Sequence, residues 1–159
     1  NLENGINQFE RVSCYSPIYH DEQGVYTARP LYYAMRAFSL AGLGQRLALQ
    51  SGVSGINLKS YAVRDGHGRI WVTLINKDPT QTAEVTISSS QSIPSASAIR
   101  LTAPSLDSKT GVTLGGAAIS NAAGKEGDWR AAERERLRAV GGDLRLQVPA
   151  ASAAFVEIG

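Results

Sequence analysis

The chain has 159 residues, 43% of them hydrophobic and 19% charged, a composition typical of a folded domain with a real core. Its formal net charge of +2 is too small to indicate nucleic-acid binding, and its basic residues form no single block. No apolar run approaches the roughly 20 residues that span a bilayer, so we expect no membrane partner. The chain does not begin with Met and shows no signal peptide, which favours a processed or truncated product.

The front of the chain is predicted to form a strand with its exit loop over residues 6–18, followed by one long helix. Pro30 suits the first helical turn, where no backbone N–H is needed, and Gly42 and Gly44 follow the end of the helix. Apolar residues recur along it at helical spacing, at Leu31, Ala34, Met35, Phe38 and Ala41. Because a strand, a loop and one helix cannot bury this stripe, we interpret residues 1–44 as the last β/α unit of a larger closed barrel.

Residues 45–159 show short apolar runs separated by turn residues, which predicts a mainly β domain, an antiparallel β-sandwich of about eight strands. The predicted strands are Arg46–Leu49, Leu58–Arg64, Arg69–Asn76, Ala83–Ser88, Ala96–Thr102, Val112–Leu114, Leu144–Val148 and Ala153–Ile158.

Three local features of this second region carry further predictions. The run Asp65-Gly66-His67-Gly68 between two alternating segments predicts a β-hairpin. Trp71 is expected in the sandwich core or at its interface with the preceding barrel. Asp128 is expected to cap a short charged helix that ends at Arg138, before Gly141 and Gly142.

Several ordered segments resemble a known enzyme family. YSPI, ARPLYYAMRAF and LAG are similar to the end of the catalytic barrel of glycoside hydrolase family 79, the β-glucuronidase and heparanase-like group. LKSYAVRDGHGRIWVTLINKD, AIRLTAPSLDSKTGVTLGG and VPAASAAFVEI resemble the β-sandwich that follows this barrel. The resemblance implies a (β/α)8 barrel before the sandwich, retaining hydrolysis of uronic-acid glycosides, no cofactor, and a secreted or periplasmic protein.

The same resemblance decides which residues we expect to act. Both catalytic glutamates of the family lie on earlier barrel strands, so we assign no catalytic residue in this chain, and the missing N-terminal barrel is its expected partner. The loop after the last barrel strand faces the active site, which makes Asn7, Tyr15 and Ser16 the candidate substrate contacts. Many relatives have a motif close to N-x-H-G-G where this chain reads INQFE, which weakens the inherited role of Asn7. Tyr15 fits a rim aromatic and a substrate contact equally well.

No metal or nucleophile pattern stands out. His20 and His67 are the two histidines, and neither has a second ligand at metal spacing. Cys14 is the one cysteine, and we interpret it as a small buried side chain.

Two other classes of function stay open at this point: a stand-alone carbohydrate-binding module, and an immunoglobulin-like structural module. The first predicts a row of exposed aromatic residues on one sheet face. The second leaves the helix at the front unexplained.

Overall fold

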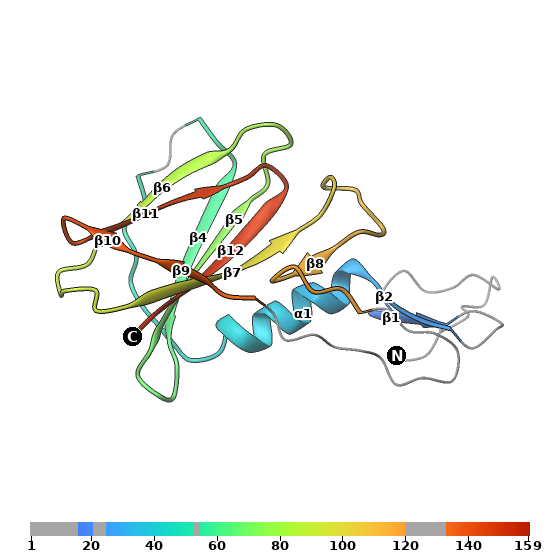
Figure 1. The fold of residues 1–159 in the computed structure, drawn as a ribbon, viewed down its shortest axis with the longest axis horizontal. Coiled ribbons are helices and arrows are strands. Elements are labelled where there is room, and N and C mark those ends of the chain that lie inside the picture. The colour runs from blue at the N-terminus through green and yellow to red at the C-terminus, as the bar shows by residue number, and fades with distance from the viewer. Residues whose placement is uncertain (1–15, 21–24, 53–54, 120–132) are drawn as a thin grey trace.

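The computed structural model describes residues 16–20, 25–52, 55–119 and 133–159 (Figure 1). In that part of the chain the fold is mainly β, with one helix, α1 (Pro30–Ala41), beside two packed sheets. The predicted fold class, an antiparallel β-sandwich preceded by a helix, is confirmed. The described part of the chain contains no helix that is long and apolar enough to cross a membrane.

The larger sheet is entirely antiparallel and has the C-terminal strand at its centre. Its order is β3 (Gln45–Arg46), β4 (Leu58–Arg64), β5 (Ile70–Asn76), β12 (Ser152–Ile158) and β7 (Ala96–Thr102). The far edge of β7 pairs with β8 (Thr113–Leu114) along one half and with β9 (Glu135–Leu137) along the other. Because β12 pairs with both β5 and β7, the end of the chain joins the two halves of this sheet.

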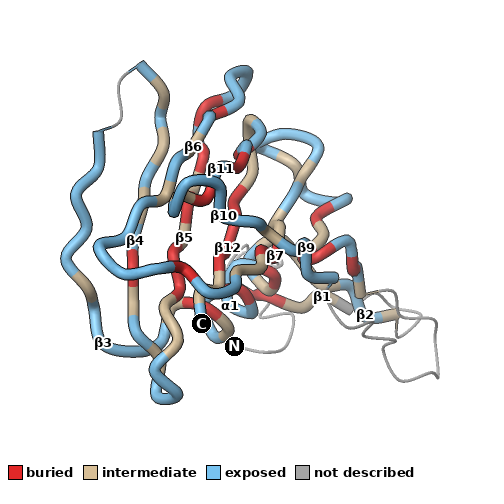
Figure 2. The backbone as a smooth tube through the Cα atoms, turned by 60° about the vertical axis from the view of Figure 1, so that its left-hand side comes forward, coloured by how far each residue is buried: buried red, intermediate tan, exposed pale blue. Residues whose placement is uncertain are grey.

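The smaller sheet has the order β10 (Ala139–Val140), β11 (Asp143–Val148) and β6 (Ala83–Ile87). Gly141 and Gly142 form the tight turn between β10 and β11, with φ of 65° and 90°. Two successive positive φ values are typical of hairpin turns and favour glycine at both positions. The sandwich core lies between the two sheets and includes Val72, Leu74, Val156, Leu144 and Val148, all buried (Figure 2).

Alternation along β5 gives the larger sheet two apolar faces. Val72 and Leu74 point into the sandwich core, whereas Trp71 and Ile75 belong to a second cluster on the outer face, against α1. Side chains alternate across a strand, so one run of seven residues serves both layers. Trp71 therefore lies outside the sandwich core, between the larger sheet and α1, and its place at an interface with a barrel stays a prediction.

Most predicted strands are present within a residue or two of their expected bounds, and the Asp65–Gly68 turn joins β4 to β5. The strand predicted at Arg46–Leu49 is reduced to β3, although the Leu47 N–H still donates to the Ala62 carbonyl at 2.9 Å. The antiparallel pair β1 (Ile18–His20) and β2 (Tyr26–Ala28) was not predicted. The division of the chain at residues 44 and 45 stays a prediction.

The charged helix predicted from Asp128 to Arg138 is wrong over its described part. Glu135–Leu137 forms β9, which pairs with β7, and Leu137 packs against the sandwich core. Arg100 on β7 binds the Glu135 carboxylate, with Nη2 2.8 Å from Oε2. Helix propensity is a weak preference, and here pairing with the free edge of β7 overrides it. In its described part, the expected charged helix is therefore replaced by an edge strand, β9.

The ends of α1 agree with the sequence, with Pro30 in the first turn and the Gly42 N–H bonded to the Phe38 carbonyl at 2.7 Å. Gly44 has a φ of +146°, and a Cβ there would lie 2.1 Å from the Arg64 carbonyl oxygen. Glycine at this position therefore lets the chain leave the helix and pass directly against β4.

Candidate functional site

The helix α1 has two apolar faces, and only one of them is buried. Tyr33, Ala37 and Ala41 follow at steps of four residues and pack on the outer face of the larger sheet. The predicted stripe shares Ala41 with this buried face, but its large residues lie on another side of the helix, where Leu31, Met35 and Phe38 are 41%, 55% and 60% exposed. The stripe was expected to have no partner within this chain, and within the described residues these three side chains are exposed.

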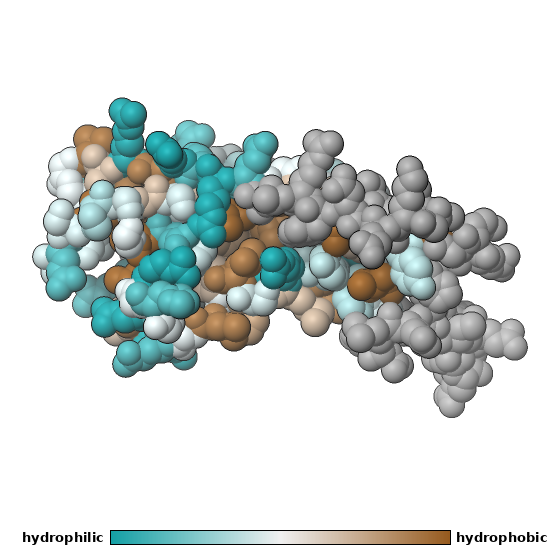
Figure 3. All heavy atoms as spheres, turned by 60° about the horizontal axis from the view of Figure 1, so that its bottom comes forward, coloured by the Kyte–Doolittle hydropathy of each residue, from teal (hydrophilic) through white to brown (hydrophobic). Residues whose placement is uncertain are grey.

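A groove of about 680 Å³ runs between α1 and the outer face of the larger sheet; we call it the α1 groove. Its helix wall includes Ala34, Phe38 and Ala41, and its floor includes Thr73 and Ile75 of β5. Figure 3 shows hydrophobic side chains gathered where the helix borders the sandwich.

Charged side chains from three separate segments, the β4–β5 turn, β12 and the residues just before β9, form a network beside this groove. The Asp65 carboxylate accepts hydrogen bonds from Arg69 Nε at 2.8 Å and from Trp71 Nε1 at 3.2 Å. Arg69 Nη1 donates to Glu157 Oε1 at 2.7 Å, and Arg134 binds the other oxygen of Glu157. Both guanidinium groups lie over the Trp71 ring, at 6.0 Å and 5.6 Å from its centroid. The network therefore fixes Trp71, which lines the groove.

Partial burial acts to raise the pKa of the Asp65 carboxyl, but its hydrogen bonds outweigh this effect. The backbone N–H groups of His67 and Arg69, with the side chains of Trp71 and Arg69, lower the pKa of Asp65 from 3.8 to about 2. Donors aimed at a carboxylate stabilise its ionised form.

Two other carboxyls behave alike. Backbone N–H groups of Thr80 and Gln81 lower the pKa of Asp78, and the Ser105 hydroxyl lowers the pKa of Asp107. The acid of a retaining glycosidase needs the opposite, a pKa raised by its surroundings. None of these three aspartates therefore suits that role.

The predicted substrate contacts fall largely outside the described residues. Asn7 and Tyr15 lie there, and Ser16, just before β1, is completely buried. The described part of the chain also holds no group of three His, Cys, Asp or Glu residues placed to bind a metal ion. Substrate contact by Asn7, Tyr15 and Ser16 stays a prediction.

Tyr33 anchors α1, although the apolar stripe predicted for this helix did not include it. Tyr33 is 3% exposed, and its hydroxyl accepts a hydrogen bond from the Ile119 N–H at 3.0 Å, which ties α1 to the chain after β8. The four-residue spacing of Tyr33, Ala37 and Ala41 is the sequence signal for the buried face of α1. The larger apolar residues of the exposed stripe gave a stronger signal for a different face.

Comparison with known proteins decides the family. The family model described as the glycosyl hydrolase family 79 C-terminal beta domain matches residues 52–155, more than half of the chain. The chain belongs to this family. The match confirms the resemblance given by the sequence motifs and covers the sandwich of the family 79 β domain. No curated protein matches the chain.

Solved structures share the fold of the family 79 β domain at low sequence identity. A family 51 α-L-arabinofuranosidase from Thermotoga petrophila has a TM-score of 0.61 and 13% identity, over 91% of this chain and 31% of its own. The catalytic domain of a family 30 xylanase C from Talaromyces cellulolyticus has a TM-score of 0.59 and 15% identity, over 91% and 27%.

A third neighbour is named a 4-O-α-L-rhamnosyl-β-D-glucuronidase, from Fusarium oxysporum, with a TM-score of 0.50 and 24% identity, over 62% of this chain and 23% of its own. The family 79 β domain described here thus spans less than a third of the length of each of these solved chains.

Proposed function

We propose that this chain supports the catalytic barrel of a retaining glycoside hydrolase that acts on glucuronic-acid-containing glycosides, and that it is not catalytic alone. Membership of the family 79 β domain gives the coarser statement, an accessory domain of a glycoside hydrolase. The exposed second apolar face of α1 is the observation that supports the barrel-supporting role. A contiguous exposed apolar surface is typical of an interaction site.

In this proposal α1 belongs to the outer ring of the barrel and the sandwich packs against the barrel flank. Tyr33, Ala37 and Ala41 join the helix to the sheet, while Leu31 and Met35 face the rest of the barrel. One helix then connects two domains through two different faces. Rigid attachment of this kind restrains the last β/α unit, and through it the loops at the active site.

The substrate class rests on the motifs and on one neighbour. The sequence resembles a group that cleaves glucuronides by double displacement, and the Fusarium oxysporum neighbour carries the name of a β-D-glucuronidase. The nucleophile and the acid/base belong to the preceding barrel. Asn7, Tyr15 and Ser16 are the residues we propose for sugar contacts in the complete enzyme.

The test compares the enzyme translated from the upstream coding sequence through residue 159 with the same enzyme ended at residue 44. We expect the complete enzyme to hydrolyse an aryl β-D-glucuronide, and the shortened one to lose activity together with thermal stability. The 159-residue chain alone is expected to show no turnover. Full activity and unchanged melting temperature after removal of residues 45–159 would refute the structural role.

A stand-alone carbohydrate-binding module is less well supported. The exposed aromatic residues of the described chain lie on three different elements, with Tyr26 on β2, Phe38 on α1 and Tyr61 on β4. They form no row on one sheet face. Calorimetric titration with glucuronic-acid oligosaccharides tests this alternative, and saturable heat at millimolar sugar would support it.

A further inference from the structure

We propose that the sandwich carries a site of its own for a uronic acid unit of a glycan, in a cleft between β7 and β11. The cleft has a volume of about 510 Å³, and we call it the β7–β11 cleft. It is separate from the α1 groove, because the two share none of their lining residues. The choice of a uronic acid rests on the proposed function as well as on the charges in the cleft.

The cleft exists because the chain changes sheets between residues 135 and 140. β9 pairs with β7 along Ala96–Ala98, whereas β10 pairs with β11 at Asp143 and Leu144. Past these pairs, within the described residues, no strand connects the edges of β7 and β11, so the sandwich is open there. Polar side chains from both sheets line the opening, among them Arg100, Thr102, Arg145 and Gln147.

Most of the polar side chains in the cleft are already held in place by one another. Arg100 Nε donates to Glu135 Oε2 at 2.9 Å, and Arg100 Nη1 donates to the Gln147 carbonyl at 2.5 Å. Gln147 Nε2 donates to Glu84 Oε1 at 2.6 Å. These contacts use one oxygen of each carboxylate and leave the other to accept from a ligand hydroxyl. Because the acceptors are fixed beforehand, less entropy is lost when a ligand binds.

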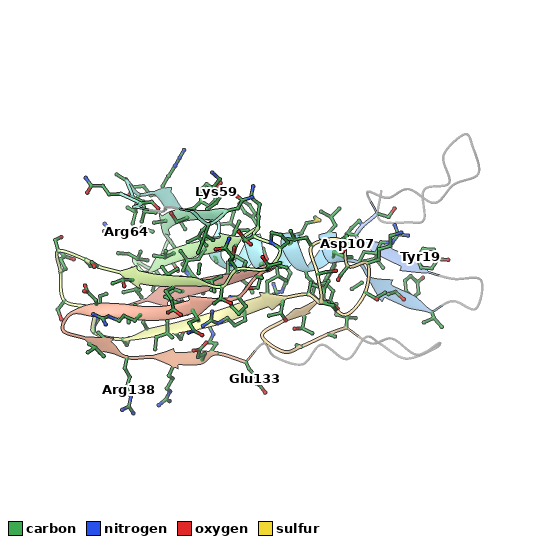
Figure 4. All side chains as sticks on the ribbon, turned by 90° about the horizontal axis from the view of Figure 1, so that it is seen from above. Tyr19, Lys59, Arg64, Asp107, Glu133 and Arg138 are labelled. Carbon is green, nitrogen blue, oxygen red and sulfur yellow. The ribbon has the colours of Figure 1, made fainter. Side chains whose placement is uncertain are left out.

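Arg145 supplies the positive charge of the cleft. It is exposed, and within the described part of the chain its guanidinium makes no ion pair or hydrogen bond. Ala139 pairs with Leu144, so Arg138 and Arg145 follow next to each other along β10 and β11. Figure 4 shows Arg138 projecting away from the sandwich, on the side opposite Arg64. Like charges on neighbouring strands repel each other, and an anion bound there would relieve this repulsion.

These groups favour a ligand with an anion at one end and hydroxyls at the other. A uronic acid unit offers a carboxylate to the planar Arg145 fork and hydroxyl donors to Glu84 and Glu135. Inorganic sulfate has no hydrogen to donate to the two glutamates, and a neutral hexose leaves Arg145 without its anion. The lining of the cleft includes no aromatic ring, so we expect an affinity of about millimolar from polar contacts alone.

Photolabelling locates the site in the complete enzyme, whether or not the barrel binds the same sugar. The probe is a glucuronic-acid oligosaccharide that carries a diazirine, and labelled peptides are identified by mass spectrometry. We expect label on peptides of the β7–β11 cleft. Free glucuronic-acid oligosaccharide should compete with this label, whereas a neutral glucose oligosaccharide and sulfate should not.

Substitutions then test the assigned contact. Arg145→Gln should raise the probe concentration for half-maximal labelling of the cleft by about tenfold. Arg145→Lys keeps the charge but loses the planar fork, so it should give an intermediate shift. Arg64→Gln is the matched control, because Arg64 is an exposed arginine on β4, across the sandwich, and it should give no shift (Figure 4). Thermal melts of the variants confirm that each is folded.

The outcomes separate this inference from the proposed function. Label confined to the upstream barrel, or label in the cleft that Arg145→Gln leaves unchanged, overturns the site but not the barrel-supporting role. Equal competition by the neutral oligosaccharide overturns the uronic acid. The stand-alone module differs again, because it predicts binding heat from the 159-residue chain that Arg145→Gln does not reduce. Only unchanged activity and stability after removal of residues 45–159 overturns the supporting role itself.

Discussion

Asn76 should be the single polar side chain whose loss most weakens this domain. It is 1% exposed, and its Nδ2 lies within hydrogen-bond distance of the carbonyl oxygens of Gln81, Val148 and Pro149, at 2.8, 2.9 and 3.1 Å. Its Oδ1 accepts from the Asp78 N–H at 3.0 Å. One amide therefore joins the end of β5 to the β6 approach and to the turn between β11 and β12.

The expected loss of unfolding free energy follows from these hydrogen bonds. Each hydrogen bond contributes about 1 kcal/mol net, and a buried group left without a partner costs about as much again. Since two amide hydrogens serve three carbonyls, we count the bonds as weaker than ideal and expect Asn76→Ala to cost about 3 kcal/mol. For a domain of this size that corresponds to a fall in melting temperature of about 6–12 °C.

Urea and thermal unfolding, followed by circular dichroism, measure this effect. Asn57→Ala is the matched control, because Asn57 is exposed, and we expect it to change stability by about 0.5 kcal/mol or less. Asn76→Asp removes the two N–H donors and places a negative carboxylate against three carbonyl oxygens. We therefore expect it to lower the stability at neutral pH more than Asn76→Ala does. A loss below about 1 kcal/mol for Asn76→Ala would refute the reasoning.

The remaining predictions concern pH, backbone strain and association. Because the pKa of Asp65 is lowered to about 2, its stabilising effect should be complete above pH 3.8 and lost as pH falls through 2. In melts from pH 7 to pH 2, the gap between wild type and Asp65→Asn should therefore close at the acid end; a constant gap would contradict this. Ala151 has a φ of 52°, so Ala151→Gly should stabilise the chain by about 1 kcal/mol in urea unfolding, and a loss would count against strain there. We expect the 159-residue chain to self-associate through the exposed apolar face of α1, and Leu31→Glu with Phe38→Glu to abolish this association in analytical ultracentrifugation, because both side chains are exposed. A wild-type chain that is already monomeric at high concentration would disprove that expectation.

Much of the sandwich was predictable because local signals agreed with the tertiary structure. The Asp65–Gly68 turn lies between two alternating strands, so turn chemistry and period both indicated the β4–β5 hairpin. Pro30 and Gly42 gave the ends of α1 for the same reason. An element whose packing partner is close in the sequence can be predicted from the local residue pattern.

The failures share one cause, a partner far away in the sequence. Arg and Glu between residues 133 and 138 favour a helix locally, but the free edge of β7 some 35 residues earlier draws Glu135 into a strand. The network around Glu157 likewise joins three segments that are far apart in the sequence. On α1, the periodicity of apolar residues indicated one apolar face but not the second face, which contains Tyr33. The local sequence does not determine which of the two faces packs on the sheet.

The interdomain role of α1 is tested most directly at Met35. This side chain is 55% exposed, on the face of α1 that the described part of the chain does not bury. We predict that Met35→Glu leaves the melting temperature of the 159-residue chain unchanged in scanning calorimetry. In the complete enzyme the same substitution should lower it by about 5 °C or more, because a carboxylate would be forced into an apolar contact. Equal effects in the two proteins would contradict a barrel seated on this helix.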